Sequence, residues 1–439
     1  MIEGFVGEII TATSHEYVPA ATSYGVLGSP VLIARPSSTE DVSAALAYAR
    51  AQRLEVSVRS GGHTPFSTNE GGIVIDLSGV RGVEVLDGGL VRIGSGAVWG
   101  DVAQALQPHG LALSSGDTFS VGVGGLTLGG GIGWMVRQYG LTVDSMLEAE
   151  VVLASGAIVT ASATSEPELF WALRGGGGNF GVVTRFTFQA HPLQGVVTGS
   201  IDFEPNALEQ TLRNWRDVVR DAPQELNTTF LAMPSFGLDD PARWQVLFCY
   251  GSDDISAAMT ALKPLLDLPG VTGQDVGSKA YVDVLVEPEV PDRALTIIDN
   301  NGFADNFSDE LIESLVDAHT KFGSAILMIR HIQGAFNRVP ADATAIAYRD
   351  AEILIISAVF LTPDIPDDAS SKVNALWEPV AAQTAGMYGG FTNSTDPSIA
   401  ELMYPPSTLA RLRRAKSHYD PDNLFRRNHN LAPHVEGRP

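Results

Sequence analysis

The chain has 439 residues, of which 44% are hydrophobic and 18% charged, so it can bury a large core and is expected to form two domains. Its formal net charge of -23 argues against nucleic acid or an anionic membrane as a partner, because either would repel it. Residues 1–8 lack the basic start and apolar run of a signal peptide, and no later run is apolar enough to span a bilayer. We therefore expect a cytoplasmic protein.

The first half of the sequence alternates short strands and helices. Apolar runs predict strands at 31–35, 54–58, 73–77 and 90–93. A helix is expected after the capping box Ser38-x-x-Asp41, and another at 99–107. The Ser155-Gly156 pair between two apolar runs predicts a hairpin, and a helix from 165 to 174 leads through glycines to a strand at 182–188.

Two glycine-rich stretches in this half are candidate ligand-binding turns. Residues 59–64 follow a predicted strand, so their two glycines and His63 fall in the turn after it. Residues 122–133 contain seven glycines, too many for a stable strand or helix interior. Successive N–H groups without nearby Cβ atoms can bind a diphosphate. Either stretch alone is equally consistent with ordinary tight turns, but together they suggest a dinucleotide site.

A third glycine pattern, Gly176, Gly178 and Gly181, has the spacing of a Rossmann fingerprint. These glycines follow a predicted helix and precede a strand, whereas the fingerprint follows a strand and opens a helix. An NAD-binding Rossmann domain is therefore not expected.

The second half of the sequence changes character near residue 195. Helices are predicted at 208–219, 309–320, 369–382 and 408–417, and strands at 228–231, 244–250, 325–332 and 353–360. This pattern indicates an antiparallel sheet backed by helices. The single cysteine, Cys249, lies in one of these strands and is expected to be a buried structural thiol.

Four motifs together resemble the berberine-bridge-enzyme-like oxidases of the vanillyl-alcohol-oxidase superfamily. They occupy residues 59–63 (RSGGH), 96–102 (GAVWGDV), 121–131 (VGVGGLTLGGG) and 419–425 (YDPDNLF). The resemblance implies an α+β, two-domain PCMH-type FAD fold. It places an FAD-binding domain at 1–195, a substrate domain at 196–390, and a C-terminal segment at 391–439 that returns to the first domain.

The resemblance also implies the cofactor contacts. His63 matches the histidine bonded to the 8α-methyl of FAD, and Thr118 replaces the cysteine that makes a second bond in many relatives, so a single covalent link is expected. Val121 matches the position that controls oxygen access, where a small residue is typical of oxidases. The other expected FAD-binding residues are Arg59, Ser60, Gly61, Gly62, Thr64, Asp117, Gly122, Val123, Gly124, Gly125, Gly129, Gly130, Gly181, Val183, Asn428 and Asn430.

The substrate side carries less information. Alcohol-oxidising relatives use the tyrosine of a Y-x-N motif as general base, and Phe391 stands there in this chain. A phenyl ring accepts no proton, so another residue is needed or the reaction requires no strong base, as in hydride removal from a neutral amine. Tyr348 and Glu352, on one predicted strand, and Tyr404 are the catalytic candidates, although each is also explained as a packing or surface residue.

The function expected from the resemblance is an oxidase that removes a hydride from a C–N or C–O carbon of a small apolar or heteroaromatic substrate and reduces O2 to H2O2. One alternative is an oxidoreductase, or dehydrogenase, acting on a secondary metabolite, sugar or alcohol. Another is a flavin-retaining protein without turnover, suggested by the missing tyrosine. No metal is expected, and the sequence does not indicate an oligomeric state.

Overall fold

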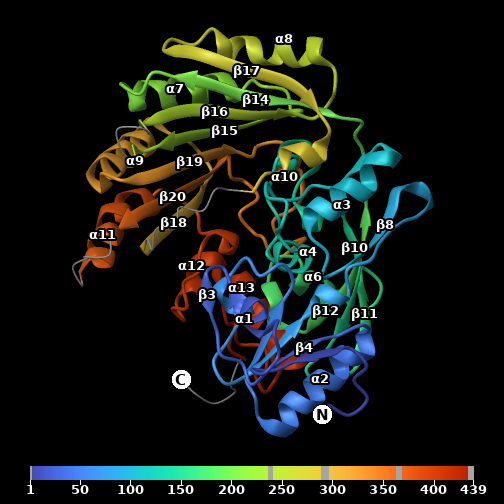
Figure 1. Ribbon diagram of the computed structural model, residues 1–439. Coiled ribbons are helices and arrows are strands. Elements are labelled where there is room, and N and C mark those ends of the chain that lie inside the picture. The colour runs from blue at the N-terminus through green and yellow to red at the C-terminus, as the bar shows by residue number, and fades with distance from the viewer. Residues whose placement is uncertain (1, 236–240, 288–295, 362–367, 434–439) are drawn as a thin grey trace.

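The computed structural model describes residues 2–235, 241–287, 296–361 and 368–433. Two parts are stacked in Figure 1. The lower part contains both the early elements and the C-terminal helix α13 (Pro406–Tyr419), and the upper part is built on one large sheet. Segments that are far apart in the sequence are therefore neighbours in the lower part.

A four-stranded sheet with the order β1-β4-β6-β5 forms one half of the lower part. Its strands are β1 (Glu8–Ile10), β4 (Leu32–Arg35), β5 (Val56–Arg59) and β6 (Ile73–Asp76), of which the last three run parallel. Helix α2 (Thr39–Gln52) packs on this sheet, and the predicted cap is present, since the Ser38 hydroxyl accepts the Asp41 N–H at 3.3 Å. The parallel strands end together at Arg35, Arg59 and Asp76.

The other half of the lower part is an antiparallel sheet with the order β11-β10-β12-β8-β7. Its strands are β7 (Val83–Val85), β8 (Leu90–Gly94), β10 (Met146–Val152), β11 (Ile158–Ser162) and β12 (Val182–Gln189). The hairpin predicted at Ser155-Gly156 joins β10 and β11, and Gly156 has φ +89°. Helices α3 (Trp99–Leu106), α6 (Pro167–Leu173) and α13 share one core with this sheet.

The upper part is a seven-stranded antiparallel sheet with the order β17-β14-β16-β15-β19-β20-β18. Its strands are β14 (Val196–Phe203), β15 (Leu226–Met233), β16 (Arg243–Tyr250), β17 (Val271–Lys279), β18 (Thr296–Ala304), β19 (Ala325–His331) and β20 (Ile353–Leu361). Four helices cover one face: α7 (Leu208–Val219), α8 (Ile255–Leu266), α9 (Asp309–Phe322) and α11 (Ala369–Ala381). The other face is turned toward the lower part (Figure 1).

Alternation along the strands separates the two faces of this sheet. Phe230, Val246 and Phe248 belong to the core beneath the helices. Cys249, next to Phe248, and Phe303 on β18 pack instead with residues of the lower part. The inward face of the sheet therefore forms the roof over the glycine-rich turns.

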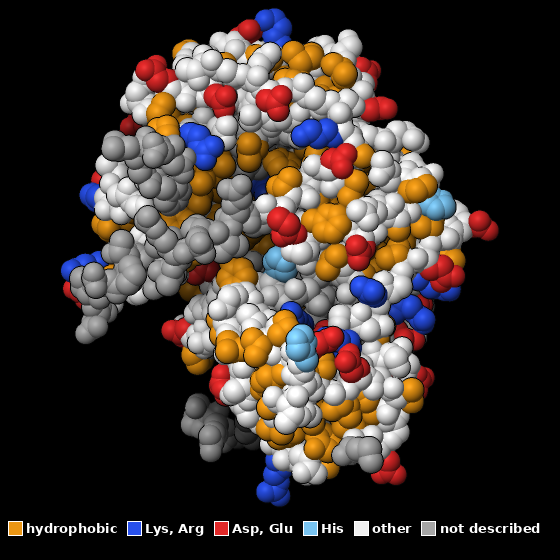
Figure 2. All heavy atoms as spheres, viewed as in Figure 1, with side chains coloured by type: hydrophobic (Ala, Val, Ile, Leu, Met, Phe, Trp, Pro, Cys, Tyr) orange, Lys and Arg blue, Asp and Glu red, His pale blue; other side chains and the backbone are white. Residues whose placement is uncertain are grey.

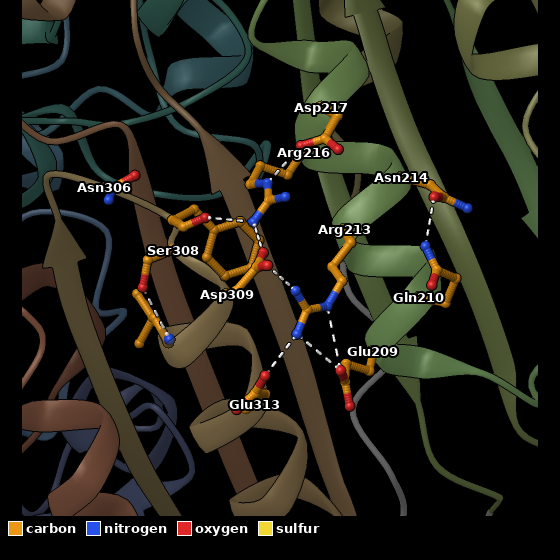
Figure 3. Close-up of polar contacts among 12 residues, drawn as sticks. Glu209, Gln210, Arg213, Asn214, Arg216, Asp217, Asn306, Ser308, Asp309 and Glu313 are labelled. Carbon is orange, nitrogen blue, oxygen red and sulfur yellow. Dashed lines mark hydrogen bonds and ion pairs between the residues drawn. The ribbon is translucent and has the colours of Figure 1, made fainter.

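An ion-pair network joins α7 and α9 on the outer surface (Figure 3). Arg213 contacts Glu209 and Glu313 at 2.9 and 2.8 Å and also pairs with Asp309, to which Arg216 is bonded at 2.5 Å. The partner carboxylates are about half-exposed, so each pair adds little stability. The network links the two helices at the surface, whereas their buried faces belong to one hydrophobic core.

Two predictions about local structure were wrong. Tyr348 and Glu352 were placed on one strand, but β20 begins at Ile353 and the residues before it form a turn followed by a bend. The glycine-rich run was expected to contain no helix, yet residues Val123–Leu128 form the short helix α4. Gly124 and Gly125 lie in the first turn of this six-residue helix, and Gly122 and Gly129 are its caps, so no glycine occupies a long helix interior.

Candidate functional site

The two glycine-rich turns touch each other through their backbones. A Cβ on Gly61 would overlap the backbone nitrogen of Gly122, and a Cβ on Gly122 would overlap that of Gly61. Ser60 reinforces the contact, because its hydroxyl donates to the Ser95 carbonyl at 2.6 Å and accepts the Gly124 N–H at 3.1 Å. The predicted meeting of these stretches therefore depends on the absence of side chains at both positions.

His63 lies at the end of the first turn, after Gly62, whose φ is +72°. Its Nε2 is 2.7 Å from the Ser120 hydroxyl, and Ser120 donates its N–H and O–H to the Glu287 carboxylate at 2.6 and 2.9 Å. Burial lowers the pKa of His63, an effect that the nearby Glu287 opposes. His63 is therefore a neutral imidazole at neutral pH, held by a chain of hydrogen bonds.

The remaining residues of the first turn have supporting roles in this structure. The Arg59 guanidinium donates to the carbonyls of Ala20 and Thr22 at 2.7 and 3.0 Å, which ties the turn to the N-terminal helix. Thr64 precedes a short 3-10 helix, and its hydroxyl lies 3.4 Å from that of Ser67. The contacts of both side chains are thus with other parts of the protein, and they do not indicate a ligand.

Backbone donors in both turns are available to an anion. Within the described ranges, the N–H groups of Gly61, Gly62 and Gly125 make no hydrogen bond, and a Cβ on Gly125 would meet open space. Farther along the second turn, Gly130 has φ +115° and borders Ile346 and Tyr388. Free donors beside open space are what a dinucleotide diphosphate requires.

The C-terminal tail supplies orphaned acceptors on the same side of the molecule. Asn179 donates to the His429 carbonyl at 3.2 Å and accepts the Leu431 N–H at 3.0 Å, which docks the tail. The Oδ1 atoms of Asn428 and Asn430 are buried and have no partner among the described residues. Because a buried acceptor without a donor costs free energy, these atoms also fit a bound cofactor.

Several predicted cofactor residues are explained by packing in this structure. Gly181 lets β12 approach β10, since a Cβ there would lie 2.6 Å from Val151 Cγ1, and Val183 is a core residue. Val123 is fully buried, and the Val121 carbonyl accepts the Trp99 N–H at 3.0 Å. Their expected contacts with FAD and the role of Val121 in oxygen access stay predictions. The single covalent link inferred from Thr118, which is partly buried, also stays a prediction.

Glu352, one of the predicted catalytic residues, is engaged in contacts within the protein, and its catalytic role stays a prediction. Its oxygens accept from Arg220 Nε and Nη2 at 2.6 and 2.8 Å and from the Phe307 N–H at 2.8 Å, and the residue is only 4% exposed. A carboxylate held by three donors and buried at the end of a strand links the sheet to the segment before α9. Both of its oxygens are therefore engaged by donors of the protein itself.

The two tyrosine candidates differ in how firmly their hydroxyl groups are hydrogen-bonded. Tyr404 is 3% exposed and donates to the Gly175 carbonyl at 2.9 Å, and burial raises its pKa far above the usual value. Tyr348 is partly buried beside Phe303, with ring centroids 5.9 Å apart, and its hydroxyl lies 3.5 Å from the Leu402 carbonyl. Tyr348 is thus the one catalytic candidate whose hydroxyl is not firmly engaged.

Three residues that the sequence analysis did not single out lie at the site. They are Glu287, already described, Tyr388 and Arg330. Tyr388 accepts the Gly131 N–H at 2.9 Å, and burial raises its pKa to about 12. Arg330 is paired with Asp117. A lone arginine in the apolar strand Ala325–His331 was the signal available for Arg330, whereas nothing in the sequence marks Glu287.

Side chains leave room between the upper and lower parts. Figure 2 shows a hollow there with largely hydrophobic walls. A separate cavity of about 580 Å³ adjoins Ser60 and Gly61 at the ends of the parallel strands, where Arg35 is already paired with Asp76.

The described residues contain no group of three or more His, Cys, Asp or Glu placed to hold a metal ion. Across the described ranges, we find no helix with the length and apolar character needed to cross a membrane.

Comparison with known proteins agrees with this geometry. Residues 30–162 match the FAD binding domain family, and residues 390–432 match the berberine and berberine-like family. The chain is 32% identical over 433 residues to (R)-6-hydroxynicotine oxidase of Paenarthrobacter nicotinovorans, covering 93% of this chain and 92% of that protein. It is 30% identical to chitooligosaccharide oxidase of Gibberella zeae, covering 92% and 87%.

Solved structures give the same result. The crystal structure of 6-hydroxy-D-nicotine oxidase from Arthrobacter nicotinovorans superimposes with a TM-score of 0.86 at 27% identity, covering 98% of both chains. The α+β, PCMH-type architecture expected from the motifs is thereby confirmed, and so is FAD as the cofactor. This chain belongs to the berberine-bridge-enzyme-like family of FAD-linked oxidoreductases.

Proposed function

We propose that this protein is an FAD-dependent oxidase whose flavin is bonded through its 8α-methyl to His63 alone. The observation that carries the proposal is the hydrogen-bond chain from Glu287 through Ser120 to His63, directly beside the two glycine turns. Thr118 supports a single link, since it has no sulfur with which to make a second one.

The chain of hydrogen bonds selects the nitrogen of His63 that reacts. Ser120 donates its own proton to Glu287, so its oxygen accepts the proton on His63 Nε2. Nδ1 then carries the free lone pair of a neutral imidazole, which is a competent nucleophile. Ser120 and Glu287 act as positioning residues that hold the ring and its tautomer.

The remaining residues bind the cofactor and exclude water. Bound FAD supplies the capacity to accept a hydride and to pass two electrons to O2, giving H2O2. The free N–H groups of Gly61, Gly62 and Gly125 bind its diphosphate, and Asn428 and Asn430 accept hydrogen bonds from it. Burial beneath the seven-stranded sheet keeps solvent from the reacting atoms.

The proposed substrate is a small apolar or heteroaromatic molecule that loses a hydride from a C–N or C–O carbon. Phe391 occupies the position of the usual base, and its ring packs on Tyr388 with centroids 5.5 Å apart. Removal of hydride from a neutral amine needs no such base, and similarity to 6-hydroxynicotine oxidase supports an amine. Similarity to chitooligosaccharide oxidase supports a sugar or alcohol as the second candidate.

Acid precipitation of the purified yellow protein tests the covalent link. Flavin absorbance should stay with the wild-type pellet and appear in the supernatant of His63→Ala. His109→Ala, which removes an exposed histidine, is the control and should behave as wild type. Release of the flavin from wild type by acid would refute attachment at His63.

Anaerobic mixing with candidate substrates tests the reaction. Bleaching by cyclic amines would support the first candidate, and bleaching by oligosaccharides or alcohols the second. Admission of O2 should then restore the colour with one H2O2 formed per substrate oxidised. Bleaching without reoxidation by O2 would indicate a dehydrogenase, and no bleaching by any compound would favour a protein that retains flavin without turnover.

A further inference from the structure

Arg330 is a buried cation that is only partly satisfied. It extends from β19 on the inward face of the large sheet, is 1% exposed, and pairs through Nη2 with Asp117 Oδ2. Its Nε and Nη1 atoms, and Asp117 Oδ1, are buried without a hydrogen-bond partner in the described chain. The free energy lost by leaving such groups unpaired is large, so this arrangement calls for a ligand or ordered water.

The neighbouring side chains are unsatisfied as well. Thr229 stands opposite Arg330 in the β15–β19 pair, and Asn227 lies two residues before it on the same face. Both are 1% exposed, and neither the Thr229 hydroxyl nor either amide atom of Asn227 has a partner among the residues described. The Arg330 guanidinium lies 5.9 Å from the Trp134 ring, whose buried Nε1 is also unpaired. These five side chains form one unsatisfied polar cluster.

The polar cluster adjoins the proposed attachment site. Asp117 is three residues before Ser120, which contacts His63, and the Asp117 carbonyl accepts the Val286 N–H next to Glu287. On the other side, Tyr388 accepts the Gly131 N–H, and its pKa is lowered by the charge of Arg330 and raised by that of Asp117. The cluster thus lies where the roof of the site meets the segment that runs from Asp117 to Ser120.

We propose that this cluster recognises a neutral substrate group that carries a hydrogen-bond donor and an acceptor side by side, such as a lactam or a hydroxyl. Arg330 donates to the acceptor and Asp117 Oδ1 accepts from the donor, with Asn227 and Thr229 completing the contacts. A carboxylate is disfavoured, because Arg330 is already neutralised and the free oxygen of Asp117 would repel it. The inference rests on the proposed oxidase function and narrows its substrate class.

Binding of small probes to the oxidised holoenzyme tests this directly, with the flavin absorbance as the readout and no turnover required. The probes are 2-pyridone for the lactam, phenol for the hydroxyl, 2-methoxypyridine as an acceptor without a donor, and benzoate as the anion. Wild type should bind 2-pyridone or phenol at least about tenfold more tightly than the other two, which corresponds to roughly 1.4 kcal/mol. Which of the first two binds better distinguishes lactam from hydroxyl.

The variant Asp117→Asn removes one negative charge with almost no change in volume. We expect benzoate to bind about tenfold more tightly to it and 2-pyridone about fivefold more weakly, because Arg330 becomes an uncompensated cation. Asp87→Asn, at an exposed carboxylate, is the control and should leave all four affinities unchanged. If Asp117→Asn fails to fold, Thr229→Val serves instead and should weaken binding of 2-pyridone and phenol while leaving that of 2-methoxypyridine and benzoate unchanged.

Three results would overturn the inference. The first is equal affinity of wild type for all four probes, or no binding of any, which would leave water as the occupant. The second is unchanged affinity of Asp117→Asn for every probe. The third is a shift in the flavin spectrum of that variant without a probe, which would mean that the Arg330–Asp117 pair contacts the cofactor. Acid-stable flavin and H2O2 formation, measured on the same preparations, report separately on the proposed function.

Discussion

The cofactor side and the substrate side of this site are built from different materials. On the cofactor side, Gly61 and Gly122 touch through their backbones, and the donors that we propose bind FAD are main-chain N–H groups. On the proposed substrate side, the inward face of the sheet offers side chains, among them Asn227, Thr229 and Arg330. A site made of backbone tolerates almost no substitution at a few glycines, whereas a site made of side chains can change its ligand one residue at a time.

The largest expected effect is on the tail that completes the cofactor side. Lys416 is fully buried and donates to Asp420 at 2.6 Å and to the carbonyls of Asn179 and Phe425 at 2.9 and 2.8 Å. Lys416→Met leaves Asp420 buried without its cation, so the free energy of unfolding should fall by about 3–5 kcal/mol. Urea unfolding of wild type and Lys416→Met measures this difference in the free energy of unfolding.

The matched control is Lys263→Met, which breaks a pair of the same i,i+4 spacing with Asp267 on the surface. A change of about 0.5 kcal/mol or less is expected there. Equal losses in the two variants would show that burial of the Lys416 pair is not what matters.

The next effect separates packing from cofactor binding on the same side. Gly122→Ala puts a Cβ against the backbone of Gly61 and should cost about 2–3 kcal/mol, together with loss of bound flavin. Gly125→Ala meets open space, so it should leave the stability of the apoprotein unchanged while weakening FAD binding. Thermal melting and flavin content of both variants test this; a stable, yellow Gly122→Ala would contradict the proposed contact.

A smaller effect is expected on the substrate side. Glu352→Gln keeps the shape but weakens the bonds to Arg220 and Phe307, so the free energy of unfolding should fall by about 1–2 kcal/mol, given that Arg220 is partly exposed. Acid-stable flavin and turnover of an identified substrate should persist. Loss of turnover with unchanged stability would restore Glu352 as a catalytic candidate.

The smallest effect concerns pH and returns to the cofactor side. Burial lowers the pKa of His63 below about 6.5, so the unfolded chain takes up a proton at a higher pH than the folded one does. This residue's contribution to stability is therefore full above that value and is lost as pH falls through the folded pKa. Covalent attachment of added FAD to apoprotein should stay nearly constant from pH 8 to 7, with its midpoint below 6.5. A midpoint at or above 6.5 would contradict the lowered pKa.

Sequence reasoning succeeded where the information is local. The turn at Gly61 and Gly62, the cap at Ser38 and the hairpin at Gly156 are each specified within a few residues, and all are present. The motifs likewise led to the correct family. The short helix α4 was missed because glycine propensity was applied to a segment that neighbouring elements hold in place.

The strand expected to carry Tyr348 and Glu352 was wrong for a physical reason. Glu352 and Tyr348 were chosen by assuming a strand register, and a turn before β20 changes where both side chains lie. Arg330 meets Asp117 across 213 residues, and Ser120 meets Glu287 across 167. No pattern within one segment contains such pairings, because the topology of the two parts creates them.

The contacts of His63 also make the proposed link a chemical record of folding. His63 reaches Ser120 across 57 residues, and Ser120 reaches Glu287 only when the upper and lower parts have docked. A chain with its strands misregistered or its two parts separated would not assemble this group of residues. The fraction of flavin that survives acid would then measure, molecule by molecule, how much of a preparation had once reached the native arrangement, even after later denaturation.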